Sequence, residues 1–294
     1  MSDQLPHTPS STDRMQCMEI WGGNAPVDRS FTVPGLEVWV YSQPYKQDAR
    51  GGDVYYVSSC LSGRITRLLV ADVSGHGQAV AGVATGLRDL MRRNVNLINQ
   101  SRFVREMNQQ FPVGPDFEIF ATALVCTFFA PTQFLQFCNA GNPVPYLFRE
   151  QAGSWSSAEE LAQVVKGQGR MADTPLGIFQ DADYSQFETK LFPEDMVLCA
   201  SDALTESLDK SGNLLGADGL LKIVNQLDPT QPSQLIPQIL RQVAAQHPGN
   251  LSQDDTTLLL FRANGTKSPR KNDWLAFFRW LRGVRDRTQL TETP

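Results

Sequence analysis

The stretch Ala71–Gly77 places the strongest constraint on this chain, because it joins two kinds of secondary structure through an acidic turn. It follows Ile65–Val70, a run of apolar and β-branched residues that predicts a buried strand. It precedes a helical pattern that begins near Gln78 and continues for about four turns. The two glycines of the stretch allow the backbone to turn tightly. We therefore expect Asp72 at the rim of a sheet, where its strand ends.

Runs of strands with helices inserted between them make up most of the chain. The predicted strands are Leu36–Tyr41, Val54–Cys60, Ile65–Asp72, Phe120–Phe129, Phe134–Asn139, Val144–Phe148, Gln186–Leu191, Met196–Ala200 and Thr256–Phe261. The predicted helices start at Gln78 and Ala203 and cover Ser101–Gln110, Leu220–Leu227 and Ser233–His247. This order predicts an α+β domain with antiparallel sheets, and the three strands between residues 120 and 148 have the pattern of a meander.

Three segments depart from this pattern. Residues 1–17 are rich in Pro, Ser, Thr and Gln, which predicts disorder. Trp21–Asn24 is expected to be a turn with an exposed or docking aromatic side chain. Residues 150–183 are irregular and predict a surface excursion. The main domain is thus expected at residues 18–263, followed by a linker and a helix in residues 264–294.

The C-terminal segment differs in charge from the rest of the chain. Residues 265–294 carry a net charge of +4, whereas the whole chain carries −5. Between Asn272 and Arg287, five apolar side chains fall on one face of a predicted helix that arginines flank. Such a basic amphipathic helix can lie on an anionic membrane surface, dock on an acidic partner protein, or pack on the acidic surface of its own domain. The sequence leaves these three alternatives open.

Composition excludes several classes of protein. A pI of about 5.3 gives no overall basic field, which argues against nucleic-acid binding. The five cysteines have no paired short spacing, so neither a zinc site nor a disulfide framework is expected. The N-terminus lacks an apolar signal-type stretch, and the longest apolar run, Phe120–Ala130, is too short to span a membrane. A cytoplasmic protein is the expectation.

Four aspartates share one local context, since each lies directly beside a predicted strand. They are Asp53, Asp72, Asp202 and Asp254. No Arg or Lys is adjacent to them in sequence, so they would repel one another if they converged, and a divalent cation would remove that repulsion. Ligation by oxygen alone favours Mg²⁺ or Mn²⁺, and two such ions can activate a water for attack at phosphorus. Each aspartate taken singly is also a common helix or turn cap.

A catalytic site based on histidine is less well supported by the sequence. His76 is the only histidine near a motif, so few residues are available to form a Ser-His-Asp triad. No Gly-Lys-Ser/Thr follows the Gly-His-Gly turn, which argues against a phosphate-binding P-loop. We expect His76 to fix the turn or line the pocket.

Six ordered blocks carry a family signature. They are Gly51-Gly52-Asp53, Asp72-Val73-Ser74-Gly75-His76-Gly77, Ala140-Gly141-Asn142-Pro143, Pro175-Leu176-Gly177, Ser201-Asp202-Ala203-Leu204-Thr205-Glu206 and Asp254-Asp255-Thr256-Thr257. In this order the chain resembles the metal-dependent protein serine/threonine phosphatases (PPM family), in the bacterial branch typified by SpoIIE and RsbU. The resemblance runs from about Leu36 to Arg262.

The resemblance implies a fold, a metal centre and a substrate class. The implied fold is a four-layer αββα sandwich of two antiparallel β-sheets flanked by helices. The implied centre holds two ions, Mn²⁺ or Mg²⁺. Asp72 would bridge them with help from the Val73 carbonyl, Asp202 and Asp254 would hold the first ion, and Asp53 the second, directly or through water. Asp72, Asp202 and Asp254 would serve catalysis by an activated water, without a phosphoenzyme. The substrate would be a phosphoserine or phosphothreonine on a regulatory protein, such as one of the anti-sigma-factor antagonist type.

Three residues depart from the family pattern. Tyr56 stands where relatives often carry an acidic or amide residue, Asn142 replaces a histidine, and Ala203 replaces a glycine. None of them removes an implied ligand. Two other functions stay open: a catalytically silent phosphatase-fold adaptor in a bacterial partner-switching pathway, and a phosphatase of small metabolites.

Overall fold

The computed structural model describes residues 12–14, 19–60, 63–75, 78–95, 97–111, 119–166, 173–266 and 285–286. The strands within this part of the chain are β1 (Thr12–Arg14), β2 (Glu19–Gly23), β3 (Val27–Val33), β4 (Leu36–Gln43), β5 (Val54–Cys60), β6 (Ile65–Val73), β7 (Ala121–Phe129), β8 (Phe134–Ala140), β9 (Tyr146–Arg149), β10 (Ser154–Ser157), β11 (Gln163–Lys166), β12 (Gln186–Lys190), β13 (Met196–Ala200), β14 (Thr256–Ala263) and β15 (Arg285–Asp286). The helices are α1 (Gln78–Asn94), α2 (Gln100–Gln110), α3 (Ala158–Leu161), α4 (Gly216–Val224), α5 (Pro232–Ala244), and the 3₁₀ turns η1 (Tyr45–Gln47) and η3 (Asp202–Leu204).

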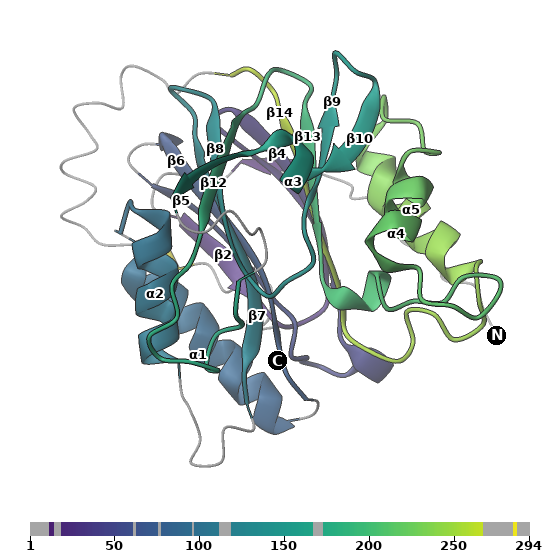
Figure 1. Ribbon diagram of the computed structural model, residues 1–294, viewed down its shortest axis with the longest axis horizontal. Coiled ribbons are helices and arrows are strands. Elements are labelled where there is room, and N and C mark those ends of the chain that lie inside the picture. The colour runs from purple at the N-terminus through teal and green to yellow at the C-terminus, as the bar shows by residue number, and fades with distance from the viewer. Residues whose placement is uncertain are drawn as a thin grey trace.

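The strands form two sheets that pack face to face (Figure 1). One sheet has the order β1-β3-β4-β14-β13-β9-β10, and the other has the order β11-β12-β8-β7-β6-β5-β2-β15. Neighbouring strands are antiparallel, except for the parallel pairs β1–β3 and β15–β2 at the sheet edges. Helices α1 and α2 cover the second sheet, and α4 and α5 cover the first (Figure 1). The predicted four-layer αββα sandwich is confirmed.

Strand β6 shows why the central strands read as continuous apolar runs. Side chains that point to one face, such as Leu68 and Val70, lie in the core between the two sheets. Side chains that point to the other face, such as Leu69 and Ala71, pack under α1 and α2. Because both faces are covered, alternation between apolar and polar residues is lost. The same double burial explains β13, in which every residue is buried.

The N-terminal region differs from its prediction. Residues 12–14, within the segment expected to be disordered, form β1 beside β3. Trp21 lies in β2 instead of a turn, and it is only 4% exposed. Its ring packs on Phe31 with the ring centroids 5.0 Å apart. The aromatic side chain therefore belongs to the core and is no docking residue.

The meander prediction is wrong for its third strand. Strands β7 and β8 are paired as expected, whereas β9 pairs with β13 in the other sheet. The turn at Gly141–Pro143 carries the chain across, because it ends β8 in one sheet and leads to β9 in the other. The excursion at residues 150–183 also contains regular structure, namely β10, α3 and β11.

Most of the predicted C-terminal helix lies outside the described residues. Residues 285 and 286 form the short strand β15, so the helix does not extend over them. The membrane, partner and self-packing alternatives stay predictions. Within the described part of the chain, no helix combines the length and apolar character that a membrane crossing needs. Cys126, Cys138 and Cys199 are free and buried, as expected, while the side chains of Cys17 and Cys60 lie outside the description.

Arg67 on β6 fastens the connection between α1 and α2 to the sheet. Its side chain is 2% exposed, donates hydrogen bonds to the carbonyls of Val95 (3.0 Å) and Leu97 (2.5 Å), and lies 4.3 Å from the centre of the Phe103 ring. We expect Arg67→Ala to lower the free energy of unfolding by about 3 kcal/mol, because one buried and one partly buried carbonyl lose their donor and a cavity remains. Urea denaturation measures this loss.

Arg102 provides the matched control for that prediction. Its side chain is 66% exposed and contacts Glu106 one turn away on α2 at 3.8 Å. Arg102→Ala is expected to change the free energy of unfolding by less than about 0.5 kcal/mol. Equal losses in the two variants would contradict the role assigned to Arg67.

Candidate metal centre

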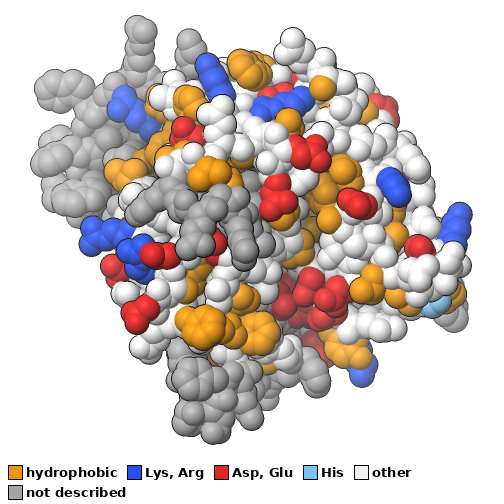
Figure 2. Space-filling model, in the orientation of Figure 1, with side chains coloured by type: hydrophobic (Ala, Val, Ile, Leu, Met, Phe, Trp, Pro, Cys, Tyr) orange, Lys and Arg blue, Asp and Glu red, His pale blue; other side chains and the backbone are white. Residues whose placement is uncertain are grey.

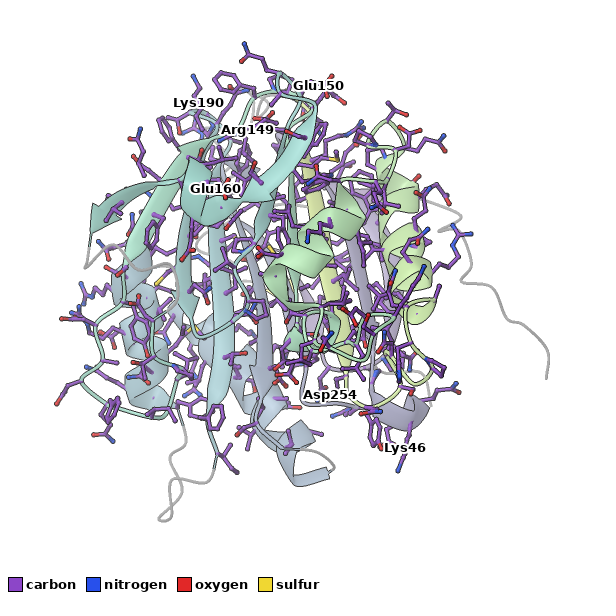
Figure 3. The ribbon with its side chains drawn as sticks, turned by 45° about the vertical axis from the view of Figure 1, so that its right-hand side comes forward. Lys46, Arg149, Glu150, Glu160, Lys190 and Asp254 are labelled. Carbon is purple, nitrogen blue, oxygen red and sulfur yellow. The ribbon has the colours of Figure 1, made fainter. Side chains whose placement is uncertain are left out.

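The four predicted aspartates lie at one end of the sandwich, where strands of both sheets begin or end. Asp53 precedes β5 and Asp72 lies in β6, both in the eight-stranded sheet. Asp202 follows β13 and Asp254 precedes β14, both in the seven-stranded sheet. Figure 3 shows Asp254 at the end opposite Arg149, Glu150 and Lys190, and acidic side chains gather on the lower part of the face in Figure 2.

Strand pairing explains why these carboxylates converge. In the antiparallel pair β5–β6, Val54 is opposite Ala71, so Asp53 and Asp72 follow at the same edge. In the pair β13–β14, Ala200 is opposite Leu258, and the N–H of Ser201, directly after β13, donates to the carbonyl of Thr257 in β14 at 2.9 Å. Packing of one sheet on the other then brings the two edges together.

Like charges dominate the electrostatics of this edge. Burial, followed by the carboxylates of Asp202 and Asp254, raises the pKa of Asp72 to about 7. Burial, followed by Glu206 and Asp254, raises the pKa of Asp202 to about 6. Burial and repulsion between neighbouring carboxylates thus hold the pKa values of both carboxyls above their ordinary range.

Asp53 is the most deeply buried member. It is 3% exposed, and burial together with Asp72 raises its pKa well above the usual range, although hydrogen bonds from Thr257 and Ser201 partly offset the rise. Its Oδ2 atom has no hydrogen-bond partner among the described residues. A buried carboxylate oxygen without a donor is unfavourable unless another group binds it.

Asp255, which belongs to the last of the six sequence blocks, fixes the loop that carries Asp53. Its carboxylate accepts hydrogen bonds from the backbone N–H groups of Tyr45 (2.5 Å), Gly52 and Asp53 (3.2 Å). A Cβ atom on Gly51 would lie 2.3 Å from Oδ2 of Asp255. The close approach of this carboxylate to the backbone therefore requires glycine at position 51.

The Val73 carbonyl lies beside the same loop. A Cβ atom on Gly52 would lie 2.9 Å from this carbonyl oxygen and 3.4 Å from Oδ1 of Asp72. The N–H of Val73 donates to the Gly52 carbonyl at 3.3 Å, which ties the two segments together. Glycine at position 52 thus leaves both oxygens uncovered. Gly75, with φ of +100°, starts the turn toward α1, and His76 lies outside the described residues.

The three departures from the family pattern have different surroundings. Asn142 is buried, and its side-chain amide donates to the Ala200 carbonyl at 3.1 Å, so it links the turn after β8 to the end of β13. Tyr56 is fully buried between the eight-stranded sheet and α1 and α2, and Ala203 is buried in η3. Glu206 is a residue whose role the sequence did not indicate. Its carboxylate raises the pKa values of Asp72 and Asp202.

The donor set fits a hard divalent cation. Among the described residues, no three Asp, Glu, His or Cys side chains stand in an arrangement that could hold a metal ion as it is. The carboxylates nevertheless repel one another, and Oδ2 of Asp53 is buried without a donor. Binding of a cation would relieve both conditions. Because all the donors are oxygen atoms, Mg²⁺ or Mn²⁺ fits the residues present better than zinc or copper.

Comparison with known proteins gives the family. A family model described as Stage II sporulation protein E (SpoIIE) matches residues 62–264, which is more than half of the chain. The chain belongs to the SpoIIE family. The match contains the blocks with Asp72, Asp202 and Asp254, while Asp53 precedes it. The resemblance inferred from the sequence blocks is confirmed.

This SpoIIE-family protein has a curated relative, phosphoserine phosphatase RsbU of Bacillus subtilis (strain 168). The two are 23% identical over 228 residues, which cover 77% of this chain and 63% of RsbU. The chain thus spans less than two thirds of the length of that relative.

Solved structures share the fold. The RsbU and RsbW domains of Rv1364c from Mycobacterium tuberculosis match with a TM-score of 0.64 and 22% identity, over 88% of this chain and 70% of that one. The PP2C phosphatase domain of SpoIIE from Bacillus subtilis, with a fragment of its regulatory domain, matches with a TM-score of 0.66 and 15% identity, over 80% and 64% of the two chains. RsbX, solved in complex with magnesium, matches with a TM-score of 0.54 and 16% identity, over 80% and 99%.

Proposed function

We propose that this protein is a metal-dependent protein serine/threonine phosphatase that hydrolyses phosphoserine or phosphothreonine on a regulatory protein. The observation that carries the proposal is the buried Asp53, whose Oδ2 has no hydrogen-bond partner among the described residues, next to Asp72. Membership of the SpoIIE family and the PP2C-type fold support it.

Five groups would hold two Mg²⁺ or Mn²⁺ ions. Asp202 and Asp254 would bind the first ion, Asp53 the second, and Asp72 both, with the Val73 carbonyl completing the second site. Asp72 suits the shared position, because its pKa responds to Asp202 and Asp254 from the other sheet and it raises that of Asp53 on its own sheet. When bound, such ions polarise the phosphoryl oxygens and lower the pKa of a water for attack at phosphorus.

The surrounding residues prepare the site before any ion binds. The carboxylate of Asp255 fixes the backbone of Gly52 and Asp53 through their N–H groups. Asn142 and Ser201 join the ends of strands that carry the other ligands. Rigid placement of ligands reduces the entropy that metal binding must otherwise overcome.

Two relatives support the proposed substrate class. RsbU is named a phosphoserine phosphatase, and one matching structure contains RsbU and RsbW domains in the same protein. We infer a partner-switching pathway in which the substrate is a small phosphorylated regulatory protein, for example of the anti-sigma-factor antagonist type.

A turnover assay with defined metals tests the proposal. We expect the protein to release phosphate from a phosphoserine peptide and from p-nitrophenyl phosphate with Mn²⁺ or Mg²⁺, and to lose at least about 95% of that rate with excess EDTA, since the ligands are carboxylates that act only through an ion. Binding of Mn²⁺ without any turnover would indicate the adaptor. Turnover of small esters alone would indicate a metabolite phosphatase.

A further inference from the structure

We infer that Asn24 is a positioning residue for Asp53 and thereby sets the affinity of the second metal site. This inference rests on the proposed function, because it assumes that Asp53 ligates an ion. Asn24 directly follows β2, in the Trp21–Asn24 segment whose role the sequence did not reveal.

Asn24 binds the loop before Asp53 through both its backbone and its side chain. The N–H of Gly51 donates to the Asn24 carbonyl at 2.8 Å. In return, Nδ2 of Asn24 donates to the Gly51 carbonyl at 2.9 Å and to the Ala81 carbonyl of α1 at 3.2 Å. Asn24 is 5% exposed, so these bonds are shielded from water and their loss is not made good by solvent.

Asp255 holds the same loop from the seven-stranded sheet. Its carboxylate accepts hydrogen bonds from the N–H groups of Gly52 and Asp53, and it touches the position that a Cβ atom of Gly51 would occupy. Gly51, Gly52 and Asp53 are therefore gripped between Asn24 and Asp255. Glycine has no side chain through which the loop could be anchored, so these polar contacts replace packing.

These contacts with Asn24 and Asp255 are important because the carboxylate of Asp53 must stay in one position to bind an ion. Its carboxylate is buried, Oδ2 has no partner among the described residues, and Gly52 lies against Asp72 and the Val73 carbonyl. If Asn24 releases the Gly51 carbonyl, the loop gains freedom and the Asp53 oxygens are no longer held where the other ligands are. The affinity for the ion that Asp53 binds would fall, whereas the site that Asp202 and Asp254 form would be spared.

Asn24→Asp tests the inference, because aspartate has the size of asparagine but no N–H to donate. We expect isothermal titration calorimetry of the full chain with Mn²⁺ to show the dissociation constant of one site raised at least tenfold and that of the other changed less than threefold. With a phosphopeptide, we expect the rate to recover at saturating Mn²⁺, so that the metal requirement rises while kcat stays within threefold.

Asn225 supplies a control for the chemical change itself. Its side-chain amide also donates to two carbonyls, those of Trp155 (3.0 Å) and Leu221 (3.1 Å), but it lies at an exposed position between β10 and α4. Asn225→Asp makes the same substitution away from the four aspartates and is expected to change neither Mn²⁺ affinity. If Asn24→Asp does not fold, Asn24→Ser replaces it, with an expected increase of at least fivefold in the same dissociation constant.

The outcomes separate the inference from the proposed function. A parent protein that binds two Mn²⁺ ions, with a folded Asn24 variant that binds both equally well, would overturn the role of Asn24 alone. A parent protein that binds no Mn²⁺ would overturn both the role and the proposed phosphatase. If the Asn24 and Asn225 variants lowered the Mn²⁺ affinity equally, Asn24 would have only a general structural role.

Discussion

Asp72→Asn is expected to reduce metal-dependent phosphate release by at least about a thousandfold and, at the same time, to raise the Tm of the metal-free protein. The loss of activity follows because Asp72 is the proposed shared ligand of both ions. The gain in stability follows because the carboxylate of Asp72 repels those of Asp53, Asp202 and Asp254. Removing its charge relieves repulsion that burial intensifies. Initial rates with Mn²⁺ and calorimetric melting in EDTA measure the two effects.

Asp183 provides a matched control for that substitution. Its side chain is 84% exposed and contacts Arg105 at 2.5 Å. Asp183→Asn removes the same charge from an exposed ion pair, and we expect it to leave both activity and Tm nearly unchanged. A destabilised Asp72→Asn protein in EDTA would contradict the repulsion argument, and an active one would contradict the ligand role.

The stability of the metal-free protein is expected to fall as the pH rises from about 4 to about 7. The folded pKa values of Asp72 (about 7) and Asp202 (about 6) lie above the ordinary aspartate value of 3.8. The folded state therefore binds more protons than the unfolded state in this window, and the free energy of unfolding decreases with pH. At about 1.36 kcal/mol per pKa unit, the two groups together set an upper bound of roughly 6 kcal/mol on this decrease.

Bound metal should reverse the decrease of stability with rising pH. With saturating Mn²⁺ the carboxylates are neutralised, so the difference in Tm between the Mn²⁺ and EDTA samples should widen from pH 5 to pH 7. Melting curves of the full chain across this range, with and without metal, provide the measurement. In EDTA, Asp72→Asn should flatten the curve. A parent protein whose stability in EDTA rises from pH 5 to pH 7 would show that the cluster is not under repulsion.

Local pattern was enough to predict most elements of the fold. Val54–Cys60 was predicted and observed with the same bounds, and Thr256–Phe261 extends by two residues to Ala263. These strands are determined by alternating or continuous apolar residues, which are properties of neighbours in sequence. Strand β9 lies close to its predicted residues, but the sheet to which it belongs was predicted wrongly. Its pairing with β13 depends on contacts between residues far apart in sequence, which local periodicity does not contain.

The sequence alone predicted the family and the ligand candidates and favoured a hard divalent cation, because aspartates beside strands and oxygen-only ligation are visible in single residues and their neighbours. Only the tertiary structure decided how the loop of Asp53 is held. Asn24 and Gly51 are 27 positions apart, and Gly52 and Asp255 are 203 positions apart, so no motif links them. The first contact arises when β2 pairs with β5 in one sheet, and the second arises when the two sheets pack and their edges meet. The carboxylates were thus predictable one at a time, whereas their repulsion and the grip on Asp53 exist only in the folded chain.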